Sequence, residues 1–268
     1  MSTAIQPTTV RDDWIAGRRG RLFVRTWSPA SPSSLAPIVL LHDSLGCVEL
    51  WRDFPAALCE ATGRQVIAYD RLGFGRSEAY PGALALDFVA AEAEGDFAAL
   101  TRQLGLERFI VFGHSVGGGM AVHCAARFPD ACVALVTESA QGFVEDRTVQ
   151  GIEDARQLFK EPGAVDRLKK YHGEKAQWVL DAWVNSWLHP AFADWSLRPV
   201  LPQVQCPTLV IHGIDDEYGS SRHPEMIAAL SGGPAQLELM ADTRHVPHRE
   251  KAGEVIWMLR QFSDGLAG

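Results

Sequence analysis

A serine, an aspartate and a histidine are the residues of this chain most able to do chemistry together. Ser115 stands at the centre of Gly113–Gly118, a Gly-x-Ser-x-Gly pattern that follows the apolar run 109–112. The pattern is typical of a nucleophile elbow, a strained turn between a buried strand and a helix. Glycine is needed on both sides of the serine, because a Cβ there would collide with neighbouring backbone. The alternative interpretation is a glycine-rich turn without chemistry.

A serine nucleophile needs a base, and the base needs an acid that orients it. Asp216 follows the apolar run 208–211, and His245 follows the run 237–240. Open α/β sheets place their sites at the carboxyl ends of strands, where both residues are expected. Asp215 is the alternative acid, although it can instead fix the turn by bonding its own backbone. His248 is the alternative base, although its position at the start of the last helix favours a packing role.

Short apolar runs alternate with helical patterns along most of the chain. This alternation predicts an α/β fold with a mostly parallel central sheet of about eight strands and helices on both faces. The polar alternation of residues 21–27 suits an antiparallel edge strand. The predicted strands are 21–27, 38–41, 66–69, 109–112, 133–136, 208–211 and 237–240, and the predicted helices are about 50–62, 84–104, 117–127, 223–231 and 251–263.

The strand pattern stops between residues 140 and 203, where charged helical stretches alternate with aromatic residues. This change predicts a helical cap insertion at 140–203 in a core made of residues 1–139 and 204–268. Trp183 and Trp187 are four residues apart and would share one face of a helix. With Phe143 they are candidates for an apolar substrate pocket above Ser115. Alternatively, these aromatic residues form a small core of the insertion itself.

The composition of the chain limits the classes of partner. A formal charge of -8 over 268 residues, without a basic stripe, argues against nucleic-acid binding. The N-terminus lacks the features of a secretory signal, and no apolar run could span a bilayer. A cytoplasmic protein without membrane contact is expected, either a monomer or a small homo-oligomer. The five cysteines are widely spaced, which indicates reduced thiols. Neither a metal nor a cofactor is expected.

From about residue 20 to its end, the chain resembles the α/β-hydrolase superfamily with a helical cap. Besides the elbow, the resemblance includes 40–42 and the Asp-x-x-Gly-x-Gly-x-Ser segment that ends at Ser77. It implies that Ser115 is the nucleophile, His245 the general base and Asp216 the orienting acid. It also implies an oxyanion hole formed by the backbone N–H groups of two residues, Ser44 and Val116. Asp43 departs from the family, which usually has glycine there.

The expected function is hydrolysis of a small-molecule substrate. An acyl-serine mechanism fits esters, lactones or thioesters of small to medium apolar acids. A carbon–carbon hydrolase acting on a diketone from aromatic-ring breakdown would use the same triad. There are two alternatives from other classes: a cofactor-free oxygenase or haloperoxidase-like enzyme, and a non-catalytic ligand-binding protein. Fold analogy alone does not decide between these functions and hydrolysis.

Overall fold

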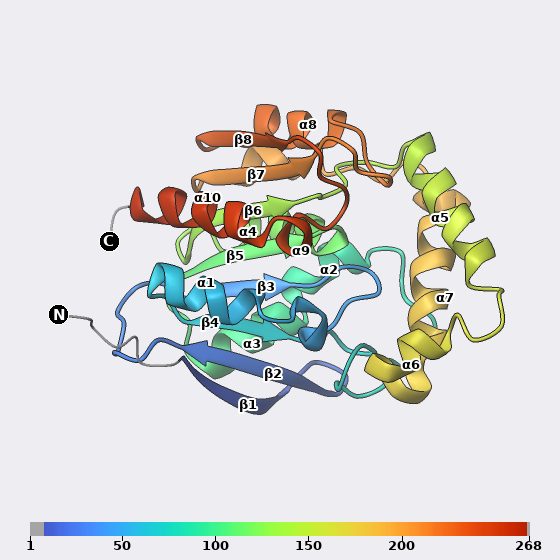
Figure 1. The fold of residues 1–268 in the computed structure, drawn as a ribbon, viewed down its shortest axis with the longest axis horizontal. Helices are drawn as coiled ribbons and strands as arrows, with labels where there is room; N and C mark the ends of the chain where they lie inside the picture. The colour runs from blue at the N-terminus through green and yellow to red at the C-terminus, as the bar shows by residue number, and fades with distance from the viewer. Residues whose placement is uncertain (1–7, 267–268) are drawn as a thin grey trace.

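An eight-stranded sheet forms the centre of the computed structural model, which describes residues 8–266 (Figure 1). Its strand order is β1-β2-β4-β3-β5-β6-β7-β8. Strands β1 and β2 run antiparallel to their neighbours, and the other strands pair in parallel. The strands are β1 (Thr9–Ala16), β2 (Arg21–Ser28), β3 (Ile38–Leu41), β4 (Val66–Tyr69), β5 (Phe109–His114), β6 (Cys132–Glu138), β7 (Thr208–Gly213) and β8 (Ala235–Met240). The predicted mostly parallel sheet of about eight strands is confirmed.

The edge of the sheet differs from the sequence prediction. Residues 21–27 were expected at an antiparallel edge, but β2 pairs with β4 on one side and with β1 on the other. The edge strand is β1, which the sequence prediction did not include. Its side chains are mostly exposed, so it lacks the alternation of apolar and polar residues that identifies a half-buried strand.

Helices cover both faces of the sheet. Strand β3 shows why: Ile38 and Leu40 join the core on one face, whereas Val39 and Leu41 join the core on the other. Helices α1 (Phe54–Thr62) and α10 (Ala252–Asp264) pack on the first face. The second face carries α2 (Phe88–Glu94), α3 (Asp96–Leu104), α4 (Val116–Arg127) and α8 (Arg222–Leu230). The single helix predicted at 84–104 is divided at Gly95 into α2 and α3.

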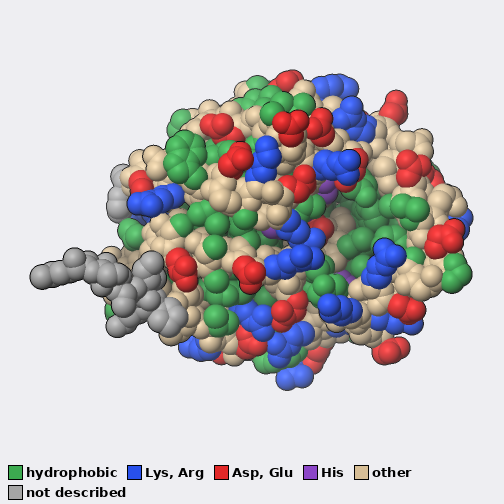
Figure 2. Space-filling view, viewed as in Figure 1, with side chains coloured by type: hydrophobic (Ala, Val, Ile, Leu, Met, Phe, Trp, Pro, Cys, Tyr) green, Lys and Arg blue, Asp and Glu red, His purple; other side chains and the backbone are tan. Residues whose placement is uncertain are grey.

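Three helices between β6 and β7 lie beyond the carboxyl ends of the parallel strands (Figure 1). They are α5 (Asp146–Leu158), α6 (Asp166–His172) and α7 (Ala176–Trp187). The surface is hollowed between these helices and the sheet, and hydrophobic side chains gather there (Figure 2). The remaining short elements are α9 (Pro247–Glu250), η1 (Val48–Trp51), η2 (Gly173–Lys175), η3 (Pro190–Phe192) and η4 (Leu201–Gln203). Within residues 8–266, none of the helices has the length and apolar character needed to cross a bilayer.

Candidate active site

Ser115 lies in a strained turn between β5 and α4. Its backbone has φ 56° and ψ −125°, a conformation that is costly for a residue with a side chain. A Cβ built on Gly113 would overlap the carbonyl oxygen of Gly117, and one built on Gly117 would overlap that of Leu41. The N–H of Ser115 donates to the carbonyl oxygen of Glu138 in the neighbouring strand, at 2.9 Å. The two glycines therefore allow the close approach that raises the serine hydroxyl above the sheet.

Ser115, His245 and Asp216 form a continuous row of hydrogen bonds. Nε2 of His245 is 3.0 Å from Oγ of Ser115, and Nδ1 is 2.8 Å from Oδ2 of Asp216. Because Nδ1 faces a carboxylate, the neutral imidazole holds its proton there and Nε2 accepts from the hydroxyl. This arrangement can remove the hydroxyl proton as Oγ attacks a carbonyl carbon.

The surroundings of the row shift the pKa values of both titratable members. Burial alone would lower the pKa of His245, but the charge and hydrogen bond of Asp216 outweigh burial and raise it above its ordinary value. Asp43 and Glu217 add to this increase. Burial would raise the pKa of Asp216, but the charge and hydrogen bond of His245 lower it overall. An ionised Asp216 beside a histidine with a raised pKa suits a base that must take up a proton during the reaction.

The backbone after β7 holds the Asp216 carboxylate in place. Its Oδ1 accepts from the N–H of Tyr218 at 2.7 Å and from that of Gly219 at 3.2 Å. Asp215, the alternative acid, is exposed, and its backbone N–H donates to the carbonyl oxygen of Thr243. Of the two candidates in this loop, the structure brings Asp216 to the histidine.

A cavity of about 90 Å³ lies over Ser115. Trp183 and Trp187 line it, as the sequence analysis expected, but Phe143 does not. The backbone of Phe143 bridges to Ser196, and its ring lies 4.3 Å from that of His223, so it packs away from the cavity. The lining residues are Asp43, Ser44, Leu45, Ser115, Gln141, Thr148, Ile152, Trp183, Trp187, Tyr218 and His245.

The loop after β3 forms another part of the cavity wall. Ser44 lies in this wall, and Val116 begins α4, where the first N–H groups of a helix have no acceptor within it. Two hydrogen bonds hold the loop: Arg71 donates to the carbonyl oxygen of Asp43 at 2.7 Å, and His172 donates to that of Leu45 at 3.0 Å. The carboxylate of Asp43 folds over Gly46, where glycine leaves room for it.

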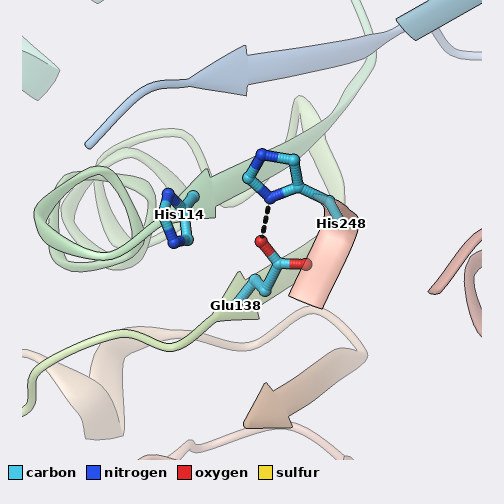
Figure 3. A group of neighbouring side chains, drawn as sticks. All are labelled: His114, Glu138 and His248. Carbon is cyan, nitrogen blue, oxygen red and sulfur yellow. Dashed lines mark hydrogen bonds and ion pairs between the residues drawn. The ribbon is translucent and has the colours of Figure 1, made fainter. Parts of the chain in front are cut away.

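His114, Glu138 and His248 form a buried group (Figure 3). Their residue types could ligate a metal such as zinc. In the structure, however, His114 Nε2 donates to the carbonyl oxygen of His245 at 2.7 Å, and His248 Nδ1 is 2.5 Å from Oε2 of Glu138. Burial lowers the pKa of His114 to about 4 and that of His248 to about 3, and raises that of Glu138 to about 7. These contacts tie the segment that carries His245 to the strand that carries Ser115.

Several cavity residues were absent from the sequence prediction. Gln141 is 4% exposed, and its Oε1 lies 3.3 Å from Oγ of Ser115. The ring of Tyr218 packs edge-on to His245, with 4.8 Å between centroids. Both follow the carboxyl end of a parallel strand, so the rule that selected Asp216 could also have selected them.

Comparisons with known proteins agree with this architecture. A family model described as "alpha/beta hydrolase fold" matches residues 36–183. Serine hydrolase BPHL of Mus musculus is 26% identical over 215 residues, which cover 74% of this chain and 68% of that protein. The bifunctional esterase/perhydrolase DCH of Acinetobacter calcoaceticus is 25% identical over 232 residues, which cover 73% of this chain and 79% of that protein.

Solved structures show the same fold. The enol-lactonase from Burkholderia xenovorans LB400 superposes with a TM-score of 0.71 at 20% sequence identity. The superposition covers 93% of this chain and 99% of that chain. Because function diverges widely within one fold, this likeness concerns architecture alone.

Proposed function

Because this chain belongs to the α/β-hydrolase fold family, we propose that it is a serine hydrolase of small to medium carboxylic esters, lactones or thioesters. The observation that carries the proposal is the row of hydrogen bonds from Asp216 through His245 to Ser115 at the wall of a cavity. The esterase and serine hydrolase names of two relatives support the same class of reaction.

In the proposed reaction, Oγ of Ser115 attacks the substrate carbonyl carbon while its proton passes to Nε2 of His245. The N–H groups of Ser44 and Val116 are proposed to bind the resulting oxyanion. Collapse of this intermediate expels the alcohol or thiol, which takes the proton from His245, and leaves an acyl-serine. Water, deprotonated by His245, then attacks the acyl carbon, and collapse of this second intermediate releases the acid while Oγ of Ser115 takes the proton back from His245.

Active-site labelling combined with turnover would test the proposal. The protein is treated with a fluorophosphonate, the adduct is located by mass spectrometry, and p-nitrophenyl esters of increasing chain length are assayed beside it. We expect stoichiometric labelling at Ser115 and turnover of short esters, both abolished in Ser115→Ala. Folded protein that neither labels nor turns over any ester would contradict the proposal and favour a ligand-binding role.

Perhydrolysis is a second candidate, favoured by the similarity to the esterase/perhydrolase DCH. In that reaction hydrogen peroxide replaces water, attacks the acyl-serine and releases a peracid. Peracid formation from an ester and peroxide, measured against hydrolysis of the same ester, distinguishes the two outcomes. Loss of both activities in Ser115→Ala is expected if they share one acyl-serine.

A further inference from the structure

Gln141 places a buried carboxamide next to the serine hydroxyl. It follows β6 through Ser139, whose φ of 48° is unfavourable for a residue with a side chain. Its Oε1 lies 3.3 Å from Oγ of Ser115. Any acyl group bound to Ser115 would therefore lie within reach of this amide.

Three of the other side chains in the cavity wall offer a ligand no free hydrogen-bond donor. Leu45 and Ile152 are apolar, and the hydroxyl of Thr148 already donates to the carbonyl oxygen of Tyr218 at 2.7 Å. Within residues 8–266, the hydrogen bond found for the Gln141 side chain involves Oε1, which leaves its amide nitrogen available to a ligand in the cavity. The buried indole N–H of Trp187, which lines the same cavity, also has no partner there.

Acylation would leave Gln141 with fewer partners than before. The one hydroxyl proton of Ser115 goes to Nε2 of His245, so Oε1 of Gln141 receives at most a share of it, and none once Oγ is esterified. An alkyl acyl group would also exclude water from the amide. A buried polar group without a partner costs about 1–3 kcal/mol. A hydroxyl on the acyl chain can both donate to Oε1 and accept from Nε2.

We propose that Gln141 selects short acyl groups with a hydroxyl or keto oxygen on the first or second carbon beyond the reacting carbonyl. This inference rests on the serine hydrolase function proposed above and refines its substrate class. The position follows from geometry, because the acyl carbon bonds to Oγ and the amide lies 3.3 Å from that atom. The small volume of the cavity over Ser115, about 90 Å³, favours an acyl group with a short chain.

Matched esters and a shape-preserving variant test this selectivity. Ethyl butanoate, ethyl 2-hydroxybutanoate and ethyl 3-hydroxybutanoate are compared in the wild type and in Gln141→Met. The ratio of kcat/KM for a hydroxy ester to that for the alkyl ester is taken in each protein, so that intrinsic reactivity cancels between proteins. We expect this ratio to fall about 10- to 100-fold in Gln141→Met for at least one hydroxy ester.

A control variant separates recognition from a change of cavity shape. Ile152→Val alters the same wall without touching an amide, and it should change kcat/KM of all three esters by a similar factor. If Gln141→Met instead lowers kcat/KM for all three esters by the same factor, Gln141 acts on a step common to every ester. The selectivity proposal is then wrong. Circular dichroism and fluorophosphonate labelling of Ser115 establish that each variant is folded.

The wild type provides a second measurement that does not depend on folding of the variant. Its rates are divided by the hydroxide-catalysed rates of the same esters, and a preference for a hydroxy ester of about tenfold or more is expected. If Ser115 is labelled but the wild type shows no preference for a hydroxy ester, the selectivity proposal is wrong and the serine hydrolase function stands. Absent labelling together with absent turnover overturns the serine hydrolase function, and the selectivity proposal with it.

Discussion

Two adjacent aspartates after β7 differ in their contact with His245, so their substitutions should differ in effect. Asp216 bonds His245, whereas exposed Asp215 does not. Asp216→Asn should lower kcat on the order of 10³- to 10⁴-fold, because an amide no longer fixes the productive tautomer. Asp215→Asn should change kcat by less than about threefold. Ester turnover by both variants checks this, and the reverse order would assign the acid to Asp215.

The raised pKa of His245 predicts where activity is lost in acid. The base must be neutral, so kcat/KM should fall tenfold per pH unit below the pKa of His245 in the free protein. Because Asp216 holds this pKa above 6.5, the loss should begin above pH 6.5, higher than for an unperturbed histidine. A pH profile of kcat/KM on one ester checks the position. A midpoint below pH 6 would contradict a base paired with an ionised carboxylate.

Asp43 gives a separate prediction about charge in the cavity wall. It is one of the acidic groups that raise the pKa of His245, and it stands beside the proposed oxyanion position. Asp43→Asn should therefore move the acid limb to lower pH. It should also raise kcat on the plateau about 2- to 10-fold, because an anion no longer opposes the developing negative charge. An unchanged limb and plateau would mean that the carboxylate is too far away to affect either group.

At the scale of elements, helix α6 joins two loops that flank the site. His172, its last residue, accepts from the N–H of Gly75 at 2.8 Å and donates to the carbonyl oxygen of Leu45 at 3.0 Å. His172→Leu should lower kcat about 10- to 100-fold with a smaller change in KM, because the neighbouring Ser44 N–H is no longer held in place. Lys169→Ala, on the exposed side of the same helix, is the control. Equal effects of the two substitutions would contradict a positioning role for His172.

The elements that the sequence predicted are those whose signal is local. The elbow around Ser115 is predictable because its glycines stand beside the serine, and the strands before Asp216 and His245 are short segments rich in apolar residues. Phe143 was assigned to the pocket from its residue type, but its direction depends on a bridge to Ser196, 53 residues later in the chain. The contact between His248 and Glu138 joins residues 110 apart. Such contacts are determined by packing between elements. The periodicity of apolar residues in the sequence does not predict them.

At the scale of the whole molecule, burial keeps most histidines neutral. Of nine histidines, seven have a lowered pKa, with burial as the largest cause: His42, His114, His123, His172, His212, His223 and His248. Below about pH 6.5 these rings bind protons in the unfolded chain, whereas in the native protein they stay neutral. Each such ring therefore reduces the free energy of unfolding as the pH falls.

Four acids, two of them buried and two half-buried, change the stability in the opposite direction. Burial raises the pKa of Asp70 to about 6 and those of Glu92 and Glu138 to about 7, and it also raises that of Asp96. In the native state these groups keep protons that the unfolded chain releases above about pH 4. Their contribution to stability is therefore present in acid and is lost as the pH rises through the native pKa values.

The balance predicts a protein that loses stability on mild acidification. Seven histidines bind protons more readily in the unfolded chain, whereas four acids and His245 bind them more readily in the native protein, so unfolding takes up protons on balance. The urea midpoint should fall markedly from pH 6.5 to pH 5.5. Glu138→Gln removes one opposing acid, so its midpoint should fall more steeply than that of the wild type. A wild-type midpoint that stays constant or rises over this range would mean that the acids outweigh the histidines.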